Sequence, residues 1–365
     1  MKTTAAALVT LCLLAIAAAG NAAGCSPISC SPSQVPLAHG RLLVVRPSGV
    51  WGPVRVVDLR TGATRWRLPS GQLAGNLLVH KDNELLTWFN VATGERIGDA
   101  EAKVRGGFGL VGASQDGARA VLQRTHKGTT TFAIVSPKRE RVVALQGSRW
   151  GFDALSGDKL YLLQYFRQGY EVRVYDLAAD RLDPAPLKDQ EEEALIGGTP
   201  WVRLSSSDGR YLFTLYLTSA GTAMVHELDV RTATARCVDL PESRDFNTAS
   251  SYTLTLSADN RTLWAVSPGD GKVAAVDVAD ARVRDSFDFE PLIPNSPTGG
   301  SAAISPDGER LAVSLVGRLW VVTFARHRVV KQKPHRAIAL GFSTNGRVLW
   351  LVDGRSRATA VKLAA

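Results

Sequence analysis

The chain has 365 residues, of which 45% are hydrophobic and 21% are charged, and its formal net charge at pH 7 is +9. This composition is typical of a folded globular protein, and it excludes an intrinsically disordered chain and a low-complexity fibre. The length allows one large domain or two domains of ordinary size.

The first 24 residues have the pattern of a secretory signal. Lys2 gives a positive start, the stretch 5–19 is apolar throughout, and small residues follow it. The apolar run is shorter than the roughly 20 residues that span a bilayer with their flanks. We therefore expect residues 1–24 to be a signal peptide and the mature protein to work outside the cytoplasm, secreted or held at the cell envelope.

Residues 22–25, Ala-Ala-Gly-Cys, resemble a bacterial lipobox, in which the cysteine is lipidated and becomes the new N-terminus. The first position departs from the pattern, because Ala22 stands where Leu is preferred. Two processing routes therefore remain open: lipidation of Cys25, or simple cleavage after Ala19 or Ala23. In the first case the protein would contact the membrane only through this lipid.

The cysteines bear on the same choice. Cys12 leaves with the signal, so that Cys25, Cys30 and Cys237 remain. An odd number of thiols in an oxidising compartment needs an explanation. Lipidation of Cys25 would leave Cys30 and Cys237 to form a disulfide. The other pairing joins Cys25 to Cys30 and leaves Cys237 as a buried apolar residue.

A tether is expected between the processed end and the folded domain. The stretch 26–36 contains three prolines and four serines. Such a composition buries little surface and disfavours both helices and strand ladders. We predict a Pro/Ser-rich tether over 25–40 and one folded domain over 41–365.

A phrase of the form Ser-x-Asp-Gly, followed by alternating apolar and polar residues, recurs along this domain. The clear copies are SQDGARAVL, SSDGRYLFTL, SADNRTLWAV, SPDGERLAVSL and STNGRVLWLV, and the weaker copies are SGDKLYLL and HKDNELLTW. Their Asp or Asn markers stand at positions 82, 116, 158, 208, 259, 307 and 345. Repeats of about 40 residues with a turn before each strand are typical of β-propeller blades.

A second phrase recurs between the markers, for example VRVVDLRTGATRW at 54–66 and AAVDVADARV at 274–283. Its period-two alternation is typical of strands that pack between neighbouring sheets. No long stretch of the mature chain has helical periodicity, which argues against an α/β fold. The sequence therefore predicts an all-β protein, a single β-propeller with four-stranded antiparallel blades.

The number and closure of the blades follow from the spacing. Division of residues 41–365 by the roughly 40 to 50 residues of a blade allows seven or eight blades, and the seven markers favour seven. The last repeat ends with the strand expected at 358–363 and lacks a fourth strand. We expect 42–46 to supply that strand and close the ring. The markers from 116 to 345 should all lie on one face.

These phrases resemble the blade motifs of known propellers. The Ser-x-Asp-Gly copies resemble the WD-repeat-like blades of TolB-like proteins, SPGDGKVAAV at 267–276 resembles the YVTN-type extracellular propellers, and VVDLRTGATRW resembles one blade motif of the quinoprotein dehydrogenases. The resemblance covers most of residues 41–365 and implies blades only. The vicinal cysteine pair of quinoprotein dehydrogenases has no counterpart here, so we expect no cofactor.

Local motifs for catalysis or metal binding are missing from the sequence. None of the six histidines lies two to four residues from another, and there is no HExxH, Cys-x-x-Cys, EF-hand, Gly-x-Ser-x-Gly or Ser-x-x-Lys motif. We interpret the markers Asp116, Asp208, Asp259 and Asp307 as caps of their own turns, and His226 as a core histidine. No metal site is predicted, and catalytic residues are unknown.

Basic residues recur in the hairpins expected between second and third strands, which emerge on one face of a propeller. They are Arg124, His126, Lys127, Arg167, Lys272, Arg318, Arg355 and Arg357. Such a ring would attract an anionic polymer of the cell envelope or an acidic protein. Arginines in the marker turns of the other face weaken the argument for a one-sided patch. Nucleic acid is not expected as a partner, because the chain has an export signal.

Two functions of different classes fit these observations. The first is a non-catalytic, monomeric binding or scaffold propeller outside the cytoplasm that engages a protein or an anionic surface polymer. The less favoured alternative is a secreted hydrolase or lyase with a site at the mouth of the central channel. Close carboxylates or histidines in the channel would favour the enzyme, whereas an apolar or Arg-rich channel would favour binding.

Overall fold

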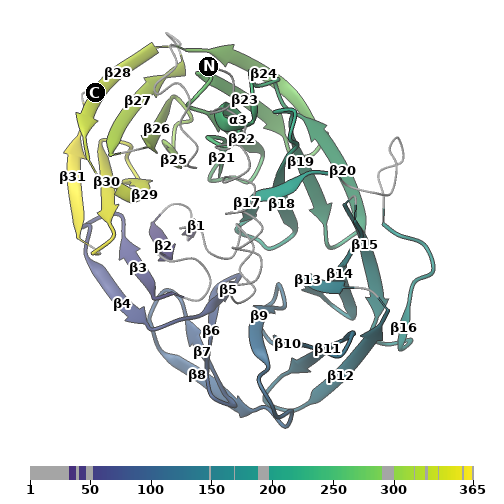
Figure 1. Ribbon diagram of the computed structural model, residues 1–365. Helices are drawn as coiled ribbons and strands as arrows, with labels where there is room; N and C mark the ends of the chain where they lie inside the picture. Colours follow the sequence, from purple (N-terminus) through teal and green to yellow (C-terminus); the bar gives the residue numbers. More distant parts are fainter. Residues whose placement is uncertain are drawn as a thin grey trace, which may run out of the picture.

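The computed structural model describes residues 33–37, 41–46, 52–147, 149–167, 169–187, 197–289, 300–315, 317–324, 328–335, 337–355 and 357–363. The signal peptide, Cys25 and Cys30 lie outside these residues. Eight antiparallel sheets follow one another around a central channel as the blades of one propeller (Figure 1). The predicted all-β propeller is confirmed, and its described part has eight blades rather than seven.

In the first four blades the strands follow one another from the channel outward. Blade 1 holds β1 (Ser33–Leu37), β2 (Leu42–Arg46), β3 (Val54–Asp58) and β4 (Thr64–Leu68), and blade 2 holds β5 (Gln72–Ala74), β6 (Leu77–Asp82), β7 (Leu85–Asn90) and β8 (Arg96–Glu101). Blade 3 holds β9 (Gly109–Ala113), β10 (Ala120–His126), β11 (Thr129–Val135) and β12 (Glu140–Gln146), and blade 4 holds β13 (Arg149–Ser156), β14 (Lys159–Tyr165), β15 (Tyr170–Asp176) and β16 (Arg181–Leu182).

The remaining blades continue the same order. Blade 5 holds β17 (Thr199–Ser205), β18 (Tyr211–Leu217), β19 (Ala223–Asp229) and β20 (Thr234–Asp239), and blade 6 holds β21 (Thr253–Leu256), β22 (Thr262–Ser267), β23 (Lys272–Asp277) and β24 (Arg282–Asp288). Blade 7 holds β25 (Ser301–Ile304), β26 (Arg310–Leu315), β27 (Arg318–Thr323) and β28 (Arg328–Pro334), and blade 8 holds β29 (Ala337–Phe342), β30 (Val348–Asp353) and β31 (Ala358–Lys362).

Burial explains the residue pattern of the strands. The second strand of a blade packs against a neighbouring blade on each side, and all seven residues of β18 are buried. The outermost strand has one neighbouring strand and faces solvent, so that β24 is mostly exposed and buries only Phe287. Strands buried on both faces have nearly continuous apolar runs, whereas outer strands alternate. The core is therefore a ring of apolar layers between adjacent blades.

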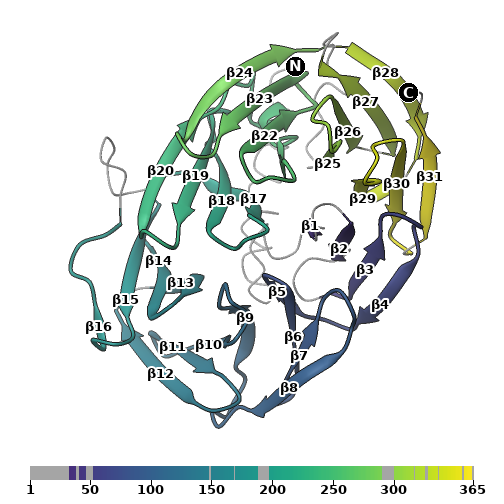
Figure 2. The same ribbon diagram turned by 180° about the vertical axis from the view of Figure 1, so that it is seen from behind.

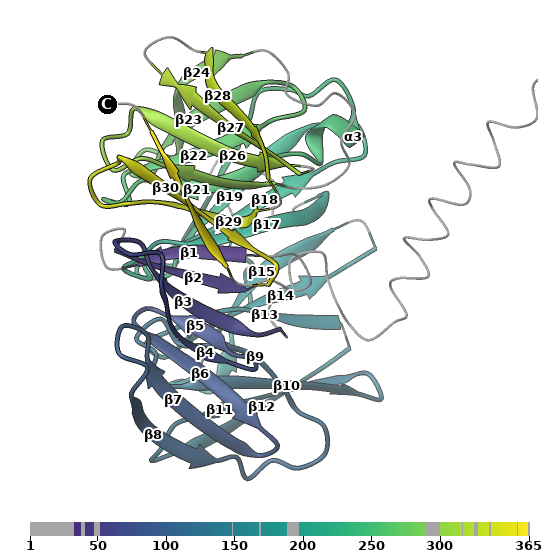
Figure 3. The same cartoon turned by 90° about the vertical axis from the view of Figure 1, so that its left-hand side faces the viewer.

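The markers from 116 to 345 all lie between the first and second strands of their blades. Because every blade runs in the same direction from the channel, these turns share one face, which we call the marker face (Figures 2 and 3). The prediction for these six markers is confirmed. Hairpins between second and third strands lie on the opposite face, which we call the hairpin face.

The phrase around Asp82 was assigned to the wrong hairpin. Asp82 ends β6, and the turn that follows leads to β7, so this turn joins second and third strands and lies on the hairpin face. The first turn of blade 2 is instead the short link between Ala74 and Leu77. Blade 1 also has no marker phrase, which is why counting markers predicted one blade too few.

The predicted closure by residues 42–46 is wrong. The strand β2 pairs with β1 and β3 inside blade 1, and blade 8 is a three-stranded sheet in the described residues. The predicted tether also overlaps the propeller, because Ser33–Leu37 forms β1. An innermost strand has a free edge toward the channel, where proline is tolerated, so Pro36 does not prevent a strand there.

Side chains, rather than a shared sheet, join blade 8 to blade 1. The indole Nε1 of Trp350 donates a hydrogen bond to the carbonyl oxygen of Leu59 at 2.6 Å. Buried residues from both blades form one cluster at this seam: Leu43, Val45, Val57, Leu59, Ala339 and Val352. The ring is therefore closed by apolar packing between its first and last blades.

The marker phrase forms a self-contained turn. In blade 5 the Ser206 hydroxyl donates to Asp208 Oδ1 at 2.6 Å and accepts from the amide of Tyr211 at 2.9 Å. Asp208 also accepts from the amide of Arg210 at 3.1 Å. Gly209 has a φ of +70°, a conformation that favours glycine. The interpretation of the marker carboxylates as turn caps is thus confirmed here, and the other copies repeat these bonds.

The helix α3 (Phe246–Ala249) lies in the link between blades 5 and 6. The Asp245 side chain caps it by accepting from the amide of Thr248 at 2.8 Å. Within the described ranges, no helix has both the length and the apolar character needed to cross a bilayer.

Candidate functional site

A cavity of about 910 Å³ lies in the central channel beside blades 1 to 5. Its wall comes mainly from first and second strands, and reaches from Arg124 and Phe166 near the hairpin face to Gln115 and Ser206 near the marker face. Cavities of roughly 300 to 1,000 Å³ are typical of sites for small molecules. This cavity is therefore large enough to enclose a ligand.

The charged groups of this wall are almost all positive. Among the described lining residues there are four arginines, one carboxylate and no histidine: Arg46, Arg124, Arg149, Arg203 and Asp153. No group of three His, Cys, Asp or Glu residues in the described part of the chain is arranged to hold a metal ion. The arrangement is suited to attract an anion.

Arg203 and Asp153 form an ion pair across blades 5 and 4. Arg203 comes from β17 and Asp153 from β13, and the Asp153 side chain is only 5% exposed. Burial lowers the pKa of Arg203, while the nearby Tyr216 hydroxyl acts in the opposite direction. Arg203 Nε has no hydrogen-bond partner among the described residues. The pair therefore holds the Arg203 guanidinium in place in the cavity wall.

Arg46 stands at the end of β2 and is half-buried. Its Nη1 donates to the Gln72 side-chain oxygen at 3.5 Å, and within the described ranges it forms no ion pair with a carboxylate. Burial lowers the pKa of Arg46 to about 10, so the group is still charged at pH 7. Arg46 is thus a partly desolvated cation that the described protein groups do not neutralise.

Arg149 and Arg124 extend the positive wall toward the hairpin face. Arg149 is exposed at the start of β13. Burial raises the pKa of Tyr165, and the positive charge of Arg149 opposes this rise. The Arg124 guanidinium lies over the Phe108 ring at 4.9 Å. It also donates to the carbonyl oxygen of Gly106 at 3.0 Å, so Arg124 is anchored at the rim.

Aromatic and apolar side chains fill the wall between these charges. Trp150, Phe152 and Tyr165 come from blade 4, and the exposed Phe166 follows Tyr165 in the hairpin. Tyr216 comes from β18 and is buried. Flat side chains of this kind provide contact area for an apolar or aromatic ligand body. The cavity therefore combines cationic and aromatic surfaces.

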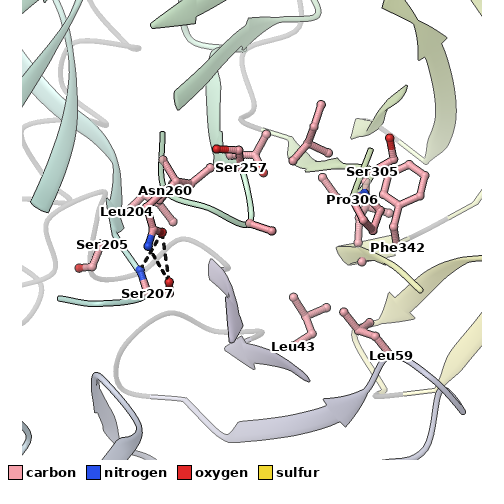
Figure 4. A pocket seen from close by; sticks show the side chains of 17 residues that line it. Leu43, Leu59, Leu204, Ser205, Ser207, Ser257, Asn260, Ser305, Pro306 and Phe342 are labelled. Atoms are coloured by element: carbon pink, nitrogen blue, oxygen red, sulfur yellow. Dashed lines mark hydrogen bonds between the residues drawn. The ribbon is translucent and has the colours of Figure 1, made fainter. Parts of the chain in front are cut away.

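A second pocket, of about 70 Å³, lies at the marker face over blades 1 and 5 to 8 (Figure 4). Leu43, Leu59 and Phe342 line it, and none of its described lining residues is charged. Asn260 Oδ1 accepts from the amide and the hydroxyl of Ser207, both at 3.1 Å. This pocket has room for only a few atoms, and its polar rim is occupied by internal hydrogen bonds.

The predicted basic residues all occur on the hairpin face but are spread over five blades. Only Arg124 lines the cavity. Lys272 Nζ donates to the carbonyl oxygen of Glu242 at 2.5 Å, and Arg357 forms an ion pair with Asp353 at 3.1 Å. The exposed members are His126, Lys127, Arg167, Arg318, Arg355 and Arg357. They surround the face rather than form one cluster.

Other singled-out residues are placed as follows. His226 is buried on β19, as predicted for a core histidine. Cys237 lies opposite it on β20 and is half-buried. Because Cys30 lies outside the described residues, its predicted disulfide with Cys237 remains a prediction, as does the lipidation of Cys25.

Sequence reasoning missed Arg46, Arg149 and Arg203, because it searched hairpins and catalytic motifs. A usable signal exists in the strands themselves. RWGFDAL at 149–155 and WVRLS at 201–205 place charged residues in innermost strands, where a propeller without a channel ligand needs small or apolar residues. Charged residues in first strands therefore indicate a site that the repeat does not require.

Comparison with known proteins assigns the chain to no family. No protein-family model and no curated protein matches the chain. Among solved structures, hydrazine synthase from Kuenenia stuttgartiensis is 12% identical with a TM-score of 0.45, and the match covers 94% of this chain and 98% of that one. The dihydro-heme d1 dehydrogenase NirN is 13% identical with a TM-score of 0.46, covering 89% and 74%.

The β-propeller domain of Cps50 (Swd1) from Myceliophteria thermophila is 14% identical, with a TM-score of 0.48 and coverage of 92% and 97%. With TM-scores below 0.5, these similarities carry no conclusion about the family or the function of this chain.

Proposed function

We propose that this protein is a non-catalytic binding propeller that takes an anionic ligand into its central cavity. The observation that carries the proposal is the balance of charge in the cavity wall, where four arginines face a single carboxylate among the described residues. Arginine is always charged and binds carboxylates and phosphates through a rigid pair of donors. An anion would neutralise charge that the described protein groups leave in excess.

The energetics of Arg46 support an anion in particular. A partly buried cation without a charged partner costs free energy, because it has lost part of its hydration. Arg46 meets a neutral amide oxygen at 3.5 Å and no carboxylate among the described residues. A bound anion would restore the lost interaction, so Arg46 favours a ligand of negative charge.

The same wall argues against the alternative of a hydrolase or lyase. Glycosidases and related enzymes need two carboxylates or a histidine near the reacting bond. Asp153 is the single carboxylate of the described wall and is already paired with Arg203. An Arg-rich channel is the pattern expected of a binding protein.

The remaining elements of the proposal come from the sequence. The signal-like residues 1–24 and the resemblance to TolB-like and YVTN-type propellers favour a site of action outside the cytoplasm, with lipid anchoring through Cys25 as one of the two routes. The exposed basic hairpins would attract an anionic surface polymer or an acidic protein to the hairpin face, outside the cavity.

A titration with one aromatic acid and its neutral analogue tests the proposal. Biphenyl-4-carboxylate should bind at least tenfold more tightly than biphenyl-4-carboxamide in isothermal titration calorimetry, because only the acid can pair with the arginines. Arg46→Gln should weaken binding of the acid about tenfold, near 1.4 kcal/mol. The control is Arg96→Gln, since Arg96 is 55% exposed on the outer strand β8. Equal affinity for acid and amide would refute an anion site.

A further inference from the structure

We infer that the ligand of this cavity is a small organic dianion, with an anionic group at each end and a flat apolar body between them. The inference rests on the proposed function and adds the number and placement of the charges. The inference is supported by the positions of the arginines in the ring, by the surface between them and by the excess positive charge of the wall.

The arginines stand on opposite walls. In a ring of eight blades the first and the fifth are diametrically opposed, and Arg46 belongs to blade 1 whereas Arg203 belongs to blade 5. Arg149 belongs to blade 4, beside Arg203 in the order of the ring (Figure 1). Guanidinium groups on opposite walls of one cavity offer separate positions to two anionic groups, one at each end of the same molecule.

The surface between these walls combines apolar and aromatic side chains with the neutral polar side chains of Gln72, Gln115, Gln123 and Thr125. Leu73 of blade 2 and Val111 of blade 3 line the cavity on one side of the channel, and Trp150 and Phe152 of blade 4 continue this lining. Of these, Trp150 is buried and the others are half-buried. A flat ring system packs against such a surface with a large contact area and little loss of conformational freedom. A hydrated, flexible polyol would leave these side chains without matching contacts.

The charges at the end of the wall formed by blades 4 and 5 are mainly positive. Arg149 and Arg203 line the cavity there, and Asp153 pairs with Arg203 and thereby orients its guanidinium. An anionic group at this end would be attracted by the remaining positive charge, whereas a cationic group would be repelled.

The size of the cavity favours a small molecule over a polymer as its ligand. A volume of about 910 Å³ is in the upper part of the range for small-molecule sites. It encloses two or three aromatic rings with their charged ends. A long polyanion would instead contact the exposed basic hairpins, which are outside the cavity. We therefore assign the cavity to a small dianion.

The test compares dicarboxylates with monocarboxylates of the same body. Terephthalate, biphenyl-4,4′-dicarboxylate and terphenyl-4,4″-dicarboxylate are each titrated beside the matching monoacid by calorimetry at low salt. At least one diacid should bind tenfold or more tightly than its monoacid. Arg46→Gln should reduce that ratio to about one, whereas Arg96→Gln should leave it unchanged.

A second variant repeats the test at Arg203, with its folding checked separately. Arg203→Gln leaves Asp153 without its partner, so it is combined with Asp153→Asn, and thermal unfolding confirms that the double variant is folded. This variant should also lose the preference for the diacid. If every diacid binds no better than its monoacid while the monoacids still exceed the neutral amide, the dianion inference fails and the proposed function stands. If the neutral amide binds as tightly as the acids, both the dianion inference and the proposed function fail. Binding of dextran sulfate that survives Arg46→Gln would assign polyanions to the hairpins instead.

Discussion

The polar groups of the marker face and those of the central cavity differ in how fully they are satisfied by hydrogen bonds. In the five clear copies of the marker phrase the serine hydroxyl, the marker side chain and the following amides satisfy one another, as for Ser343 and Asn345. In the cavity Arg46 has a single long hydrogen bond to Gln72 and no carboxylate among the described residues. The polar groups of the marker turns therefore satisfy one another, whereas the wall of the cavity has unsatisfied donors and excess positive charge.

This difference separates the residues that build the fold from those that bind. The Ser-x-Asp-Gly phrase and its close variants recur in blades 3 and 5 to 8, where they form the same turn between first and second strands, and this recurrence indicates a structural role. Arg46, Arg149 and Arg203 belong to no repeated phrase, and each stands where its blade needs no charge. Changes in the first group should therefore alter stability without altering affinity, and changes in the second group should do the reverse.

The largest effect is expected at the closure seam beside the marker-face pocket. Leu59→Ala should destabilise the protein by about 2 to 5 kcal/mol, because Leu59 is buried between blades 1 and 8 and its loss leaves a cavity. Denaturant unfolding measures this change. Affinity for biphenyl-4-carboxylate should remain that of the wild type.

The matched control for this change is Leu85→Ala, because Leu85 is 41% exposed on β7. It should change the free energy of unfolding by about 0.5 kcal/mol or less. If Leu59→Ala is as mild as Leu85→Ala, the seam does not hold the ring closed. A loss of anion affinity in Leu59→Ala would instead show that the two regions are coupled.

A smaller effect is expected in a marker turn. Ser343→Ala should cost about 1 kcal/mol, because the buried hydroxyl accepts from the Val348 amide at 2.9 Å and this amide loses its side-chain acceptor. Ser286→Ala on the outer strand β24 is the control, since Ser286 is exposed. Thermal unfolding distinguishes the two variants. Equal melting temperatures would mean that the phrase recurs for a reason other than stability.

The fold could be predicted from the sequence because the same short sequence phrases recur along the chain. Turn chemistry and period-two alternation are local, so the blades around Asp208 and Asp307 follow from short stretches. The blade count and the closure could not be predicted in the same way. Blade 1 lacks a marker, and its first strand includes Pro36 within a Pro/Ser-rich stretch. Whether β2 pairs with β1 or with β31 depends on long-range contacts that no local pattern specifies.

The candidate site was less predictable for the same physical reason. Arg46 and Arg203 are 157 positions apart in the sequence, and they line one cavity only because the ring opposes blades 1 and 5. The predicted basic hairpins were correctly assigned to one face, but only Arg124 reaches the cavity wall. Arg149 and Arg203 stand in first strands and were overlooked, because the search covered hairpins and catalytic motifs and not the innermost strands.

The smallest effect tests whether a marker carboxylate acts only within its turn. The hydrogen bond from the Ser257 hydroxyl, followed by that from the Arg261 amide and the Arg261 charge, lowers the pKa of Asp259 below its ordinary value of 3.8, although burial opposes the shift. A lowered folded-state pKa means that ionised Asp259 stabilises the fold above its ordinary pKa. This contribution is lost as the pH falls through the lowered value.

Asp259→Asn removes this titration and keeps the acceptor. Asn345 shows that the turn accommodates an amide, since its Oδ1 accepts from the Ser343 hydroxyl at 2.8 Å and from the Arg347 amide at 3.1 Å. The wild type should therefore melt slightly above the variant at pH 7, and this difference should shrink between about pH 4 and pH 2. The effect is small because the Asp259 side chain is 61% exposed. A difference that does not change with pH would mean that the charge of Asp259 contributes nothing to its turn. A loss of anion affinity at pH 7 would mean that the marker face takes part in binding, and it would remove the separation between the two regions.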